Sequence, residues 1–230
     1  MKRCLCGLVV ILGLAGSALC EESVTALTAK AKAGDAAAQE ALGNIYAVGK
    51  DGVTRDSQEA IKWYKKAAEQ GNADGEYSLG IMYELGMGVP KDVPGAIKLL
   101  EQSAKQGKVM AQFQLARIYD LAEGGVTKNP AMAAKYYEEA AESGKPVAQY
   151  KIATMYEKGE GVQQDYAASM KWYRKAAEKG FMDAEYKIGY FYQMGYGVTK
   201  DRTQALNWYH KAAEAGSDEA LNAMKEMQRN

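Results

Sequence analysis

The chain has 230 residues, with 29 Lys or Arg, 29 Asp or Glu and a single His, which gives a formal net charge of zero. A chain without a basic excess lacks the electrostatic signature of nucleic-acid binding, and one without a block of like charges lacks that of membrane-surface binding. Hydrophobic residues make up 47% of the chain, an ordinary share for a folded protein.

The first twenty residues have the pattern of a secretory signal peptide. Lys2 and Arg3 form a positive start, residues 8–14 form an apolar run, and small residues follow. The apolar run is too short to cross a membrane as a helix. We therefore expect residues 1–20 to be removed as a signal peptide, which leaves a periplasmic or secreted protein without a transmembrane segment.

Cleavage before Glu21 would remove all three cysteines of the chain, which are Cys4, Cys6 and Cys20. The mature chain would then form no disulfide, although its compartment permits one. A lipoprotein anchored through Cys20 is the alternative. We disfavour it because Leu19 occupies a position where lipoprotein signals usually have a small residue.

The rest of the chain repeats one unit five times. Tyrosines recur at intervals of 36 or 37 residues, at Tyr46, Tyr83, Tyr119, Tyr156 and Tyr192. A period of this length indicates a solenoid, in which each unit packs mainly on its neighbours.

The repeated unit begins with a helix. Before the first unit, residues 22–33 are rich in Ala and Lys and predict an N-terminal capping helix. The first helix of each unit then places a Leu or Ile and a Tyr on one face, four residues apart, with a small residue between them, as in Leu42, Gly43 and Tyr46. We expect the small residue to let two helices approach closely. A glycine suited to a left-handed backbone ends this helix in most units.

A capping residue opens the second helix of each unit, at Asp56, Asp92, Asn129, Asp165 and Asp201. Asp and Asn side chains accept hydrogen bonds from the free N–H groups of a first helical turn. An aromatic or leucine pair and then a pair of small residues follow, and a glycine stops the helix. Residues after the fifth unit predict a C-terminal capping helix.

The consensus A-x-x-x-L-G-x-x-Y-x-x-G-x-G-V-x-x-D-x-x-x-A-x-x-W-Y-x-x-A-A-x-x-G resembles the Sel-1-like repeat, a relative of the tetratricopeptide repeat. The resemblance implies one all-α domain at residues 21–230, folded as a right-handed α-solenoid of five helix-turn-helix repeats with N- and C-terminal capping helices. The repeats would span residues 36–72, 73–109, 110–145, 146–181 and 182–217, and the C-terminal cap residues 218–230.

The mature chain offers little for catalysis or metal binding. It has one histidine, His210, and no cysteine, so a zinc site or a catalytic triad lacks partners. No Ser-x-x-Lys, Gly-x-Ser-x-Gly or His-Glu-x-x-His motif occurs. The Gly-x-Gly-Val loops follow helices rather than strands, so we interpret them as turns and not as phosphate-binding loops. We expect His210 on the surface, no metal, no cofactor and no enzymatic activity.

Positions that the repeat does not require are candidates for contact with a partner. By analogy with tetratricopeptide geometry, the concave surface receives the residues two and five places after the Leu or Ile of each first helix. Tyr and Met suit interface cores because they bury much area adaptably. The hypothesis is a partner-binding patch made of Tyr190, Gln193, Met194 and Tyr196, extended by Arg117, Asp120 and Glu157. The alternative is that these aromatic side chains pack on the C-terminal capping helix.

The resemblance also implies protein–protein adaptor work. We expect a non-catalytic scaffold of the cell envelope that binds another protein through its concave face, as an envelope regulator or as an immunity protein against a secreted toxin. The alternative is a cell-wall hydrolase, or a protein that binds peptidoglycan or a β-lactam. Because both ends of the array have capping helices, we expect a monomer.

Overall fold

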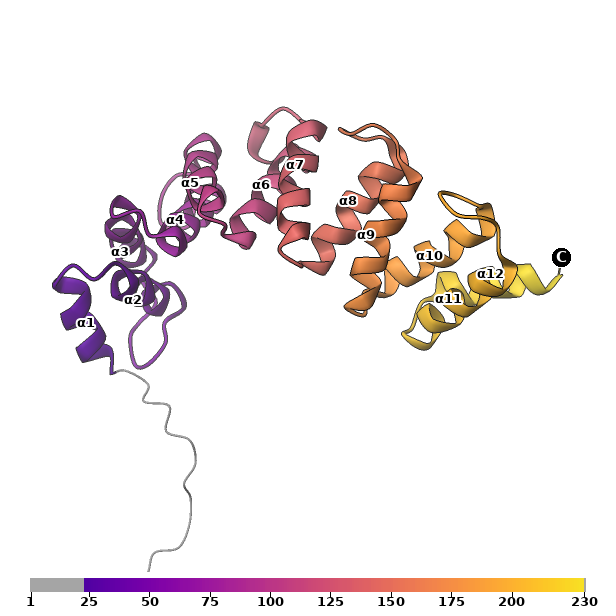
Figure 1. The fold of residues 1–230 in the computed structure, drawn as a ribbon. Helices are drawn as coiled ribbons and strands as arrows, with labels where there is room; N and C mark the ends of the chain where they lie inside the picture. Colours follow the sequence, from indigo (N-terminus) through magenta and orange to yellow (C-terminus); the bar gives the residue numbers. More distant parts are fainter. Residues whose placement is uncertain (1–22, 230) are drawn as a thin grey trace, which may run out of the picture.

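The computed structural model describes residues 23–229, and these form an open, curved row of helices (Figure 1). The predicted signal peptide, residues 1–20, lies outside the described residues. Twelve α-helices and one 3₁₀ turn make up the secondary structure of residues 23–229, which confirms the predicted all-α solenoid. None of these helices has the length and apolar character needed to cross a membrane.

The helices follow one another as five pairs, units 1 to 5, between two single end helices, α1 (Val24–Lys32) and α12 (Asp218–Arg229). The first helices of the pairs, called A helices, are α2 (Ala36–Val48), α4 (Ala73–Leu85), α6 (Val109–Leu121), α8 (Pro146–Lys158) and α10 (Met182–Met194). The second helices, called B helices, are α3 (Ser57–Glu69), α5 (Val93–Lys105), α7 (Pro130–Glu142), α9 (Tyr166–Glu178) and α11 (Arg202–Glu214). The 3₁₀ turn η1 (Glu123–Gly125) follows α6.

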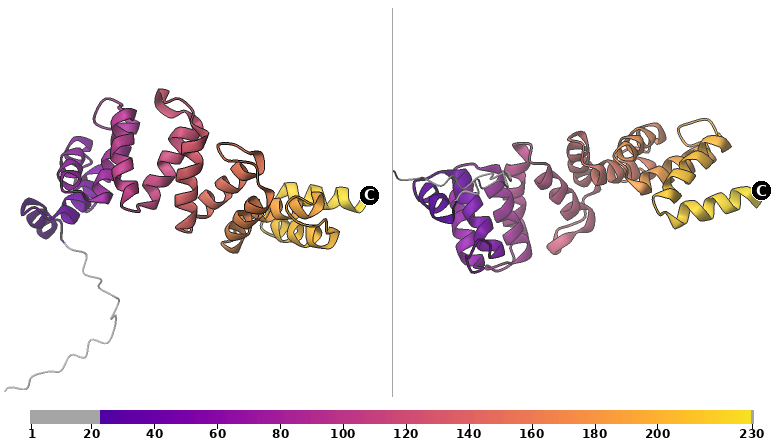
Figure 2. Two further views of the ribbon diagram at one scale, coloured as in Figure 1. Left: turned by 45° about the horizontal axis from the view of Figure 1, so that its top comes forward. Right: turned by 90° about the horizontal axis from the view of Figure 1, so that it is seen from below.

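Each A helix packs most extensively on the B helix that follows it, and each B helix packs on the next A helix. Figure 2 shows from two further directions that the pairs keep this order along the row, with α1 and α12 at opposite ends. One buried apolar cluster runs from Val93 on α5 to Phe191 on α10, and smaller clusters form at both ends. The fold is therefore built from neighbour contacts along one row.

The predicted caps of the B helices are confirmed. The side chain of each capping residue accepts a hydrogen bond from the N–H of the second or third helical residue, or from both, at Asp56, Asp92, Asn129, Asp165 and Asp201. Such a cap typically contributes about 1 kcal/mol to stability. Because the cap occupies the same place in all five units, it fixes where every B helix begins.

The small residue of each A helix lies against the B helix of the same unit, as predicted. In unit 5, a Cβ atom added at Gly189 would lie 2.6 Å from Cδ1 of Tyr209, closer than two non-bonded carbon atoms can approach. Units 3 and 4 have the buried residues Ala116 and Ala153 at this place. A larger side chain would push the two helices apart and open the core of the unit.

The A helices end at a left-handed residue, and one of these residues is not glycine. Four of the ends are glycines with positive φ, whereas α6 ends at Ala122, with φ 55°. The Cβ of an L-residue in this conformation crowds the following carbonyl, which costs about 1–2 kcal/mol. Unit 3 therefore stores backbone strain at its loop.

We predict that Ala122→Gly raises the free energy of unfolding by about 1 kcal/mol, because it removes this crowding at an exposed position. The matched change, Gly159→Ala, places the same strain at the end of α8, where φ is 71°, and should lower stability by a similar amount. Urea unfolding of both variants measures the two effects. If both variants were more stable than the wild type, or both less stable, the result would contradict this account.

A buried glutamine joins several A helices to the helix that precedes them. The side-chain amide of Gln39 donates to the carbonyl oxygen of Ala31 at 3.0 Å, and Gln149 donates to that of Ala141 at 3.1 Å. In unit 1 the oxygen of the same amide is also satisfied, because Gln70 donates to Oε1 of Gln39 at 2.7 Å. Gln70, the capping residue at the end of the B helix α3, thus satisfies the oxygen of the buried Gln39 amide.

The corresponding oxygens in the middle units have no hydrogen-bond partner. Oε1 of Gln112 and Oε1 of Gln149 are buried and receive no hydrogen bond from the described residues. The B helices of these units end at Ser143 and Lys179, in the place that Gln70 occupies in unit 1. A buried acceptor without a donor costs about 1–3 kcal/mol.

We predict that Ser143→Gln stabilises the protein by about 1 kcal/mol, because the new amide can donate to Gln112 as Gln70 donates to Gln39. Gln70→Ala is the reciprocal control and should destabilise by a comparable amount. Thermal unfolding followed by circular dichroism measures both. A Ser143→Gln protein no more stable than the wild type would mean that the acceptor is already satisfied in solution.

Candidate functional site

The A helices form the inner row of the array. Gln114 on α6 donates to both carboxylate oxygens of Glu84 on α4, at 2.6 and 2.7 Å. Lys187 on α10 pairs with Glu157 on α8 at 2.9 Å. Side chains can join one A helix to the next only where these helices are closely spaced, and in a curved row the closely spaced helices lie on the inside. We call the exposed side of α2, α4, α6, α8 and α10 the inner face.

The inner face holds most of the exposed large apolar side chains of residues 23–229. Six of these seven side chains occupy the second or the last position of an A helix, namely Val48, Leu85, Met110, Leu121, Val147 and Met194. The seventh is Leu221 on α12. Positions 110 and 121 of α6 are about three helical turns apart and lie within about 40° of Arg117 around the helix. They therefore share its side of the helix, which is the side predicted to be concave.

The last residue of the A helix is exposed and apolar in four of the five units. Val48, Leu85 and Leu121 are 67%, 59% and 57% exposed, and Met194 is 37% exposed. Unit 4 has Lys158 there. Single exposed apolar residues are ordinary on proteins. Their recurrence at one repeat position forms an apolar stripe, and such patches typically mark interaction sites.

The sequence prediction included only Met194 of this stripe. The signal was available, because an apolar residue precedes the left-handed residue of the loop in four units. The sequence does not show whether such a residue is buried or exposed, because this depends on how the neighbouring unit packs against it.

The structure brings Tyr190 and Tyr196 of the predicted patch together. Their ring centroids are 5.9 Å apart in an edge-on contact. Tyr196 also stacks on Tyr166 of α9, at 4.5 Å and 14° between the ring planes. Tyr190 contacts the cluster of α11 and α12 as well as the central one. Both rings are half-buried, so they contribute to the packing of unit 5 in addition to its surface.

Gln193, Glu157 and Asp120 share one role in the structure. Each accepts a hydrogen bond from the hydroxyl of a buried B-helix tyrosine, and the donors are Tyr209, Tyr173 and Tyr137 in that order. Burial is the main cause that raises the pKa of all three tyrosines, which keeps them protonated as donors. These predicted site residues are therefore held in place from inside the unit.

Arg117 lies on α6, and its side chain contacts residues close to it in the sequence. Arg117 pairs with Glu123 at 2.7 Å and donates to Gln114 at 3.3 Å. Glu157 lies nearer to the aromatic part of the patch, because Lys187, its ion-pair partner, lies over the ring of Tyr190 at 5.7 Å. The predicted residues thus spread along the inner face over units 3 to 5 and do not form one cluster.

His210 lies on the surface, as predicted. Its Nδ1 is 3.4 Å from a carboxylate oxygen of Glu214, and both side chains are largely exposed on α11. Within residues 23–229, no group of three or more His, Cys, Asp and Glu side chains is arranged to hold a metal ion.

The family model described as Sel1 repeat matches residues 36–72, 73–108, 109–145, 146–181 and 183–217. The protein belongs to the Sel1 repeat family. Sel1 repeat proteins act as protein–protein interaction scaffolds, and the family is generally non-catalytic. The predicted resemblance is confirmed.

Solved structures of Sel1 repeat proteins are similar to this chain. A protective antigen with an SLR fold, present in uropathogenic Escherichia coli strains, is 36% identical with a TM-score of 0.79, over 86% of this chain and 42% of the other. A Sel1 repeat protein from Oxalobacter formigenes is 32% identical with a TM-score of 0.70, over 87% of this chain and 80% of the other. This Sel1 repeat chain therefore spans less than half the length of the E. coli protein.

An immunity protein from Pseudomonas aeruginosa is more distant, at 20% identity and a TM-score of 0.44, over 83% of this chain and 72% of the other. A likeness at this level supports no statement about role. Among curated proteins there is no match.

The inner face of this Sel1 repeat protein includes a buried carboxyl group. Glu84 is 4% exposed, and its burial raises its pKa, an effect that the hydrogen bonds from Gln114 offset only in part. A carboxyl whose pKa is raised on folding binds its proton more tightly in the native state. Its ionisation therefore lowers stability as the pH rises from about 4.5 through the raised pKa.

We predict that Glu84→Gln raises the unfolding midpoint at pH 7 and that this gain shrinks as the pH falls towards 4.5, where the wild-type carboxyl is protonated. Glu142→Gln, at an exposed position on α7, is the control and should change the midpoint little at either pH. Thermal unfolding at several pH values measures the difference. A gain independent of pH would mean that the charge of Glu84 is not its cause.

Proposed function

We propose that this protein is an exported, non-catalytic scaffold of the bacterial cell envelope that binds a partner protein along its inner face. The observation that supports this most directly is the apolar stripe of Val48, Leu85, Leu121 and Met194, whose side chains are between 37% and 67% exposed on the surface of residues 23–229. Interface cores are depleted in charge and enriched in apolar and Met side chains, whereas the rim is polar. The stripe, with the polar positions beside it, has this composition.

The polar part of the inner face supports the same proposal through its rigidity. Gln193 and Glu157 accept from buried tyrosines, and Glu84 is held by Gln114. Side chains fixed before binding lose little conformational entropy when a partner arrives. The inner face is thus pre-organised for a partner of fixed shape, as an envelope regulator or an immunity protein would require.

Export is part of the proposal and rests on the signal-peptide pattern of residues 1–20. Amino-terminal sequencing of the protein purified from the periplasm or the medium should begin at or near Glu21. If the protein instead stays in the cytoplasm and keeps its first twenty residues, the proposed envelope location is wrong. The proposal that the inner face binds a partner would not be affected.

We predict that Leu85→Asp combined with Leu121→Asp weakens partner binding about 100-fold or more, because burying two leucines supplies several kcal/mol. The partner is first captured from envelope extract with immobilised residues 21–230 and identified by mass spectrometry. Its affinity for each variant is then measured by calorimetry. Both leucines are exposed, so the unfolding midpoint should stay close to that of the wild type.

Leu221→Asp is the matched control, because Leu221 is exposed on α12, outside the inner face. It should leave the affinity unchanged. Equal losses in the double variant and the control would contradict binding through the inner face. One stoichiometric partner would favour a dedicated regulator or an immunity protein, and the activity of that partner with and without this protein distinguishes the two. Several weakly bound envelope proteins would favour a general adaptor.

A further inference from the structure

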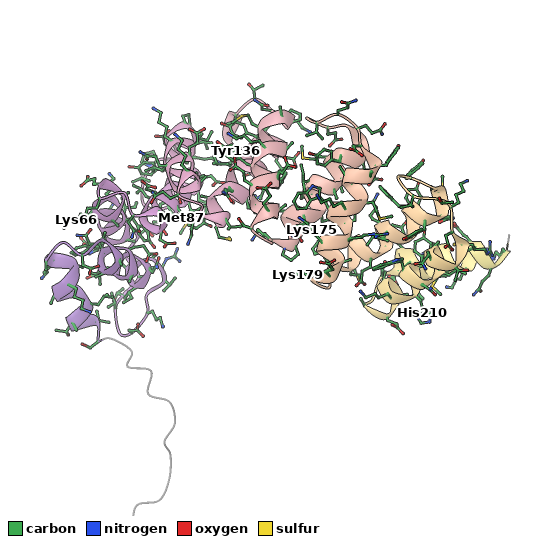
Figure 3. All side chains as sticks on the ribbon, in the orientation of Figure 1. Lys66, Met87, Tyr136, Lys175, Lys179 and His210 are labelled. Carbon is green, nitrogen blue, oxygen red and sulfur yellow. The ribbon has the colours of Figure 1, made fainter. Side chains whose placement is uncertain are left out.

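The outer side of unit 4 has a cluster of positive charge without counter-ions. Arg174 and Lys175 follow Lys171 by one turn of α9, and none of the three forms an ion pair with a carboxylate among residues 23–229. Figure 3 shows Lys175 on this helix and Lys179 nearby, as the residue that follows the last residue of α9. Of the five B helices, α9 has the largest excess of basic over acidic residues.

These side chains line a groove of about 450 Å³ between α9 and the loop that joins α10 to α11. Gly197 and Val198 of that loop form one wall, and the buried Met170 belongs to the other. Gly197 allows the close approach, because a Cβ atom there would lie 2.7 Å from the backbone of Tyr166. Glu178 is the one carboxylate among the residues that line the groove.

Two of the three cations are held by groups that leave their charge unneutralised. Nζ of Lys175 lies 4.1 Å from the centroid of the Trp172 ring. The guanidinium of Arg174 donates to the hydroxyl oxygen of Tyr192 at 2.7 Å. A ring face and a neutral hydroxyl orient a cation without cancelling its charge. The groove thus presents positioned positive charge to solvent.

The repeats provide an internal comparison. In unit 1 the cation that corresponds to Lys171 is Lys62, and Glu59, three residues before it, forms an ion pair with it. Unit 4 has Ala168 at the position of that glutamate. In unit 5, Lys211 pairs with Glu185 at 2.8 Å. Unit 4 therefore lacks the two carboxylates that neutralise one such cation in unit 1 and one in unit 5, because Ala168 and Gln149 occupy their positions.

We propose that this groove binds a small, multiply charged anion of the phosphate or phosphoester class. A guanidinium can donate two parallel hydrogen bonds to such a group, and two ammonium groups supply further charge-assisted donors. The phosphate group can belong to a free small molecule or to a lipid headgroup. This site lies on the outer side of the array, so it does not depend on partner binding by the inner face.

The test is calorimetric titration of residues 21–230 with inorganic pyrophosphate at low ionic strength. We expect one saturable site. Lys171→Gln combined with Lys175→Gln should weaken it by about tenfold or more for each charge removed, the effect of losing a hydrogen bond to a charged group. The matched control is Lys65→Gln combined with Lys66→Gln, which removes the same charge from unit 1 and should leave the affinity unchanged.

Ala168→Glu is a second variant that keeps all three cations. It restores the carboxylate that unit 1 has, so the new glutamate should pair with Lys171 and weaken pyrophosphate binding without loss of basic residues. No measurable binding by the wild type would overturn the proposal. Equal weakening by the unit 4 and unit 1 lysine substitutions would also overturn it. Pyrophosphate binding would then depend on the total charge of the protein and not on a local site.

Vesicles distinguish the two sources of the phosphate group. Co-sedimentation is measured with phosphatidylcholine vesicles that contain or lack phosphatidic acid. Binding only to the acidic vesicles, and its loss in the unit 4 variants, would support the site and assign it to lipid headgroups. Pyrophosphate binding together with no sedimentation would support the site and assign it to free phosphorylated molecules.

Discussion

The close approach of the two helices within each unit is the constraint on which the rest of the structure depends. It requires a residue no larger than alanine on the A helix where the B-helix side chain crosses it, as at Gly189 against Tyr209. Because the tyrosine ring passes beside this small residue, its hydroxyl reaches the polar positions of the inner face. The same contact therefore closes the core of the unit and orients side chains on its surface.

The units differ in their polar side chains while their apolar packing is shared. Buried apolar residues recur at the same positions, from Leu42 in unit 1 to Ile188 in unit 5. The charges on both sides of the array do not recur: the inner face has ion pairs in some units, and the outer side of α9 has cations without them. In a repeat protein the shared residues specify the fold, and the residues that vary distinguish one binding surface from another.

Sequence reasoning predicted the parts of the fold that depend on short-range contacts. The cap at Asp165 acts on residues two and three places away, and the small residue at Gly189 belongs to a pattern repeated in every unit. The surface was less accessible to this reasoning. The contact of Tyr173 with Glu157 joins residues 16 places apart, and its existence depends on the angle between two helices. The exposure of Leu85 likewise depends on how far the neighbouring unit extends over it.

The position of the apolar stripe also limits what can lie along it. Val48, Leu85 and Leu121 belong to three consecutive units, whereas Lys158 of unit 4 separates them from Met194 of unit 5. A partner that follows the whole inner face therefore meets three apolar side chains, then a lysine, then one further apolar side chain. The order of the units thus fixes the order in which the apolar and polar residues of such a partner make contact.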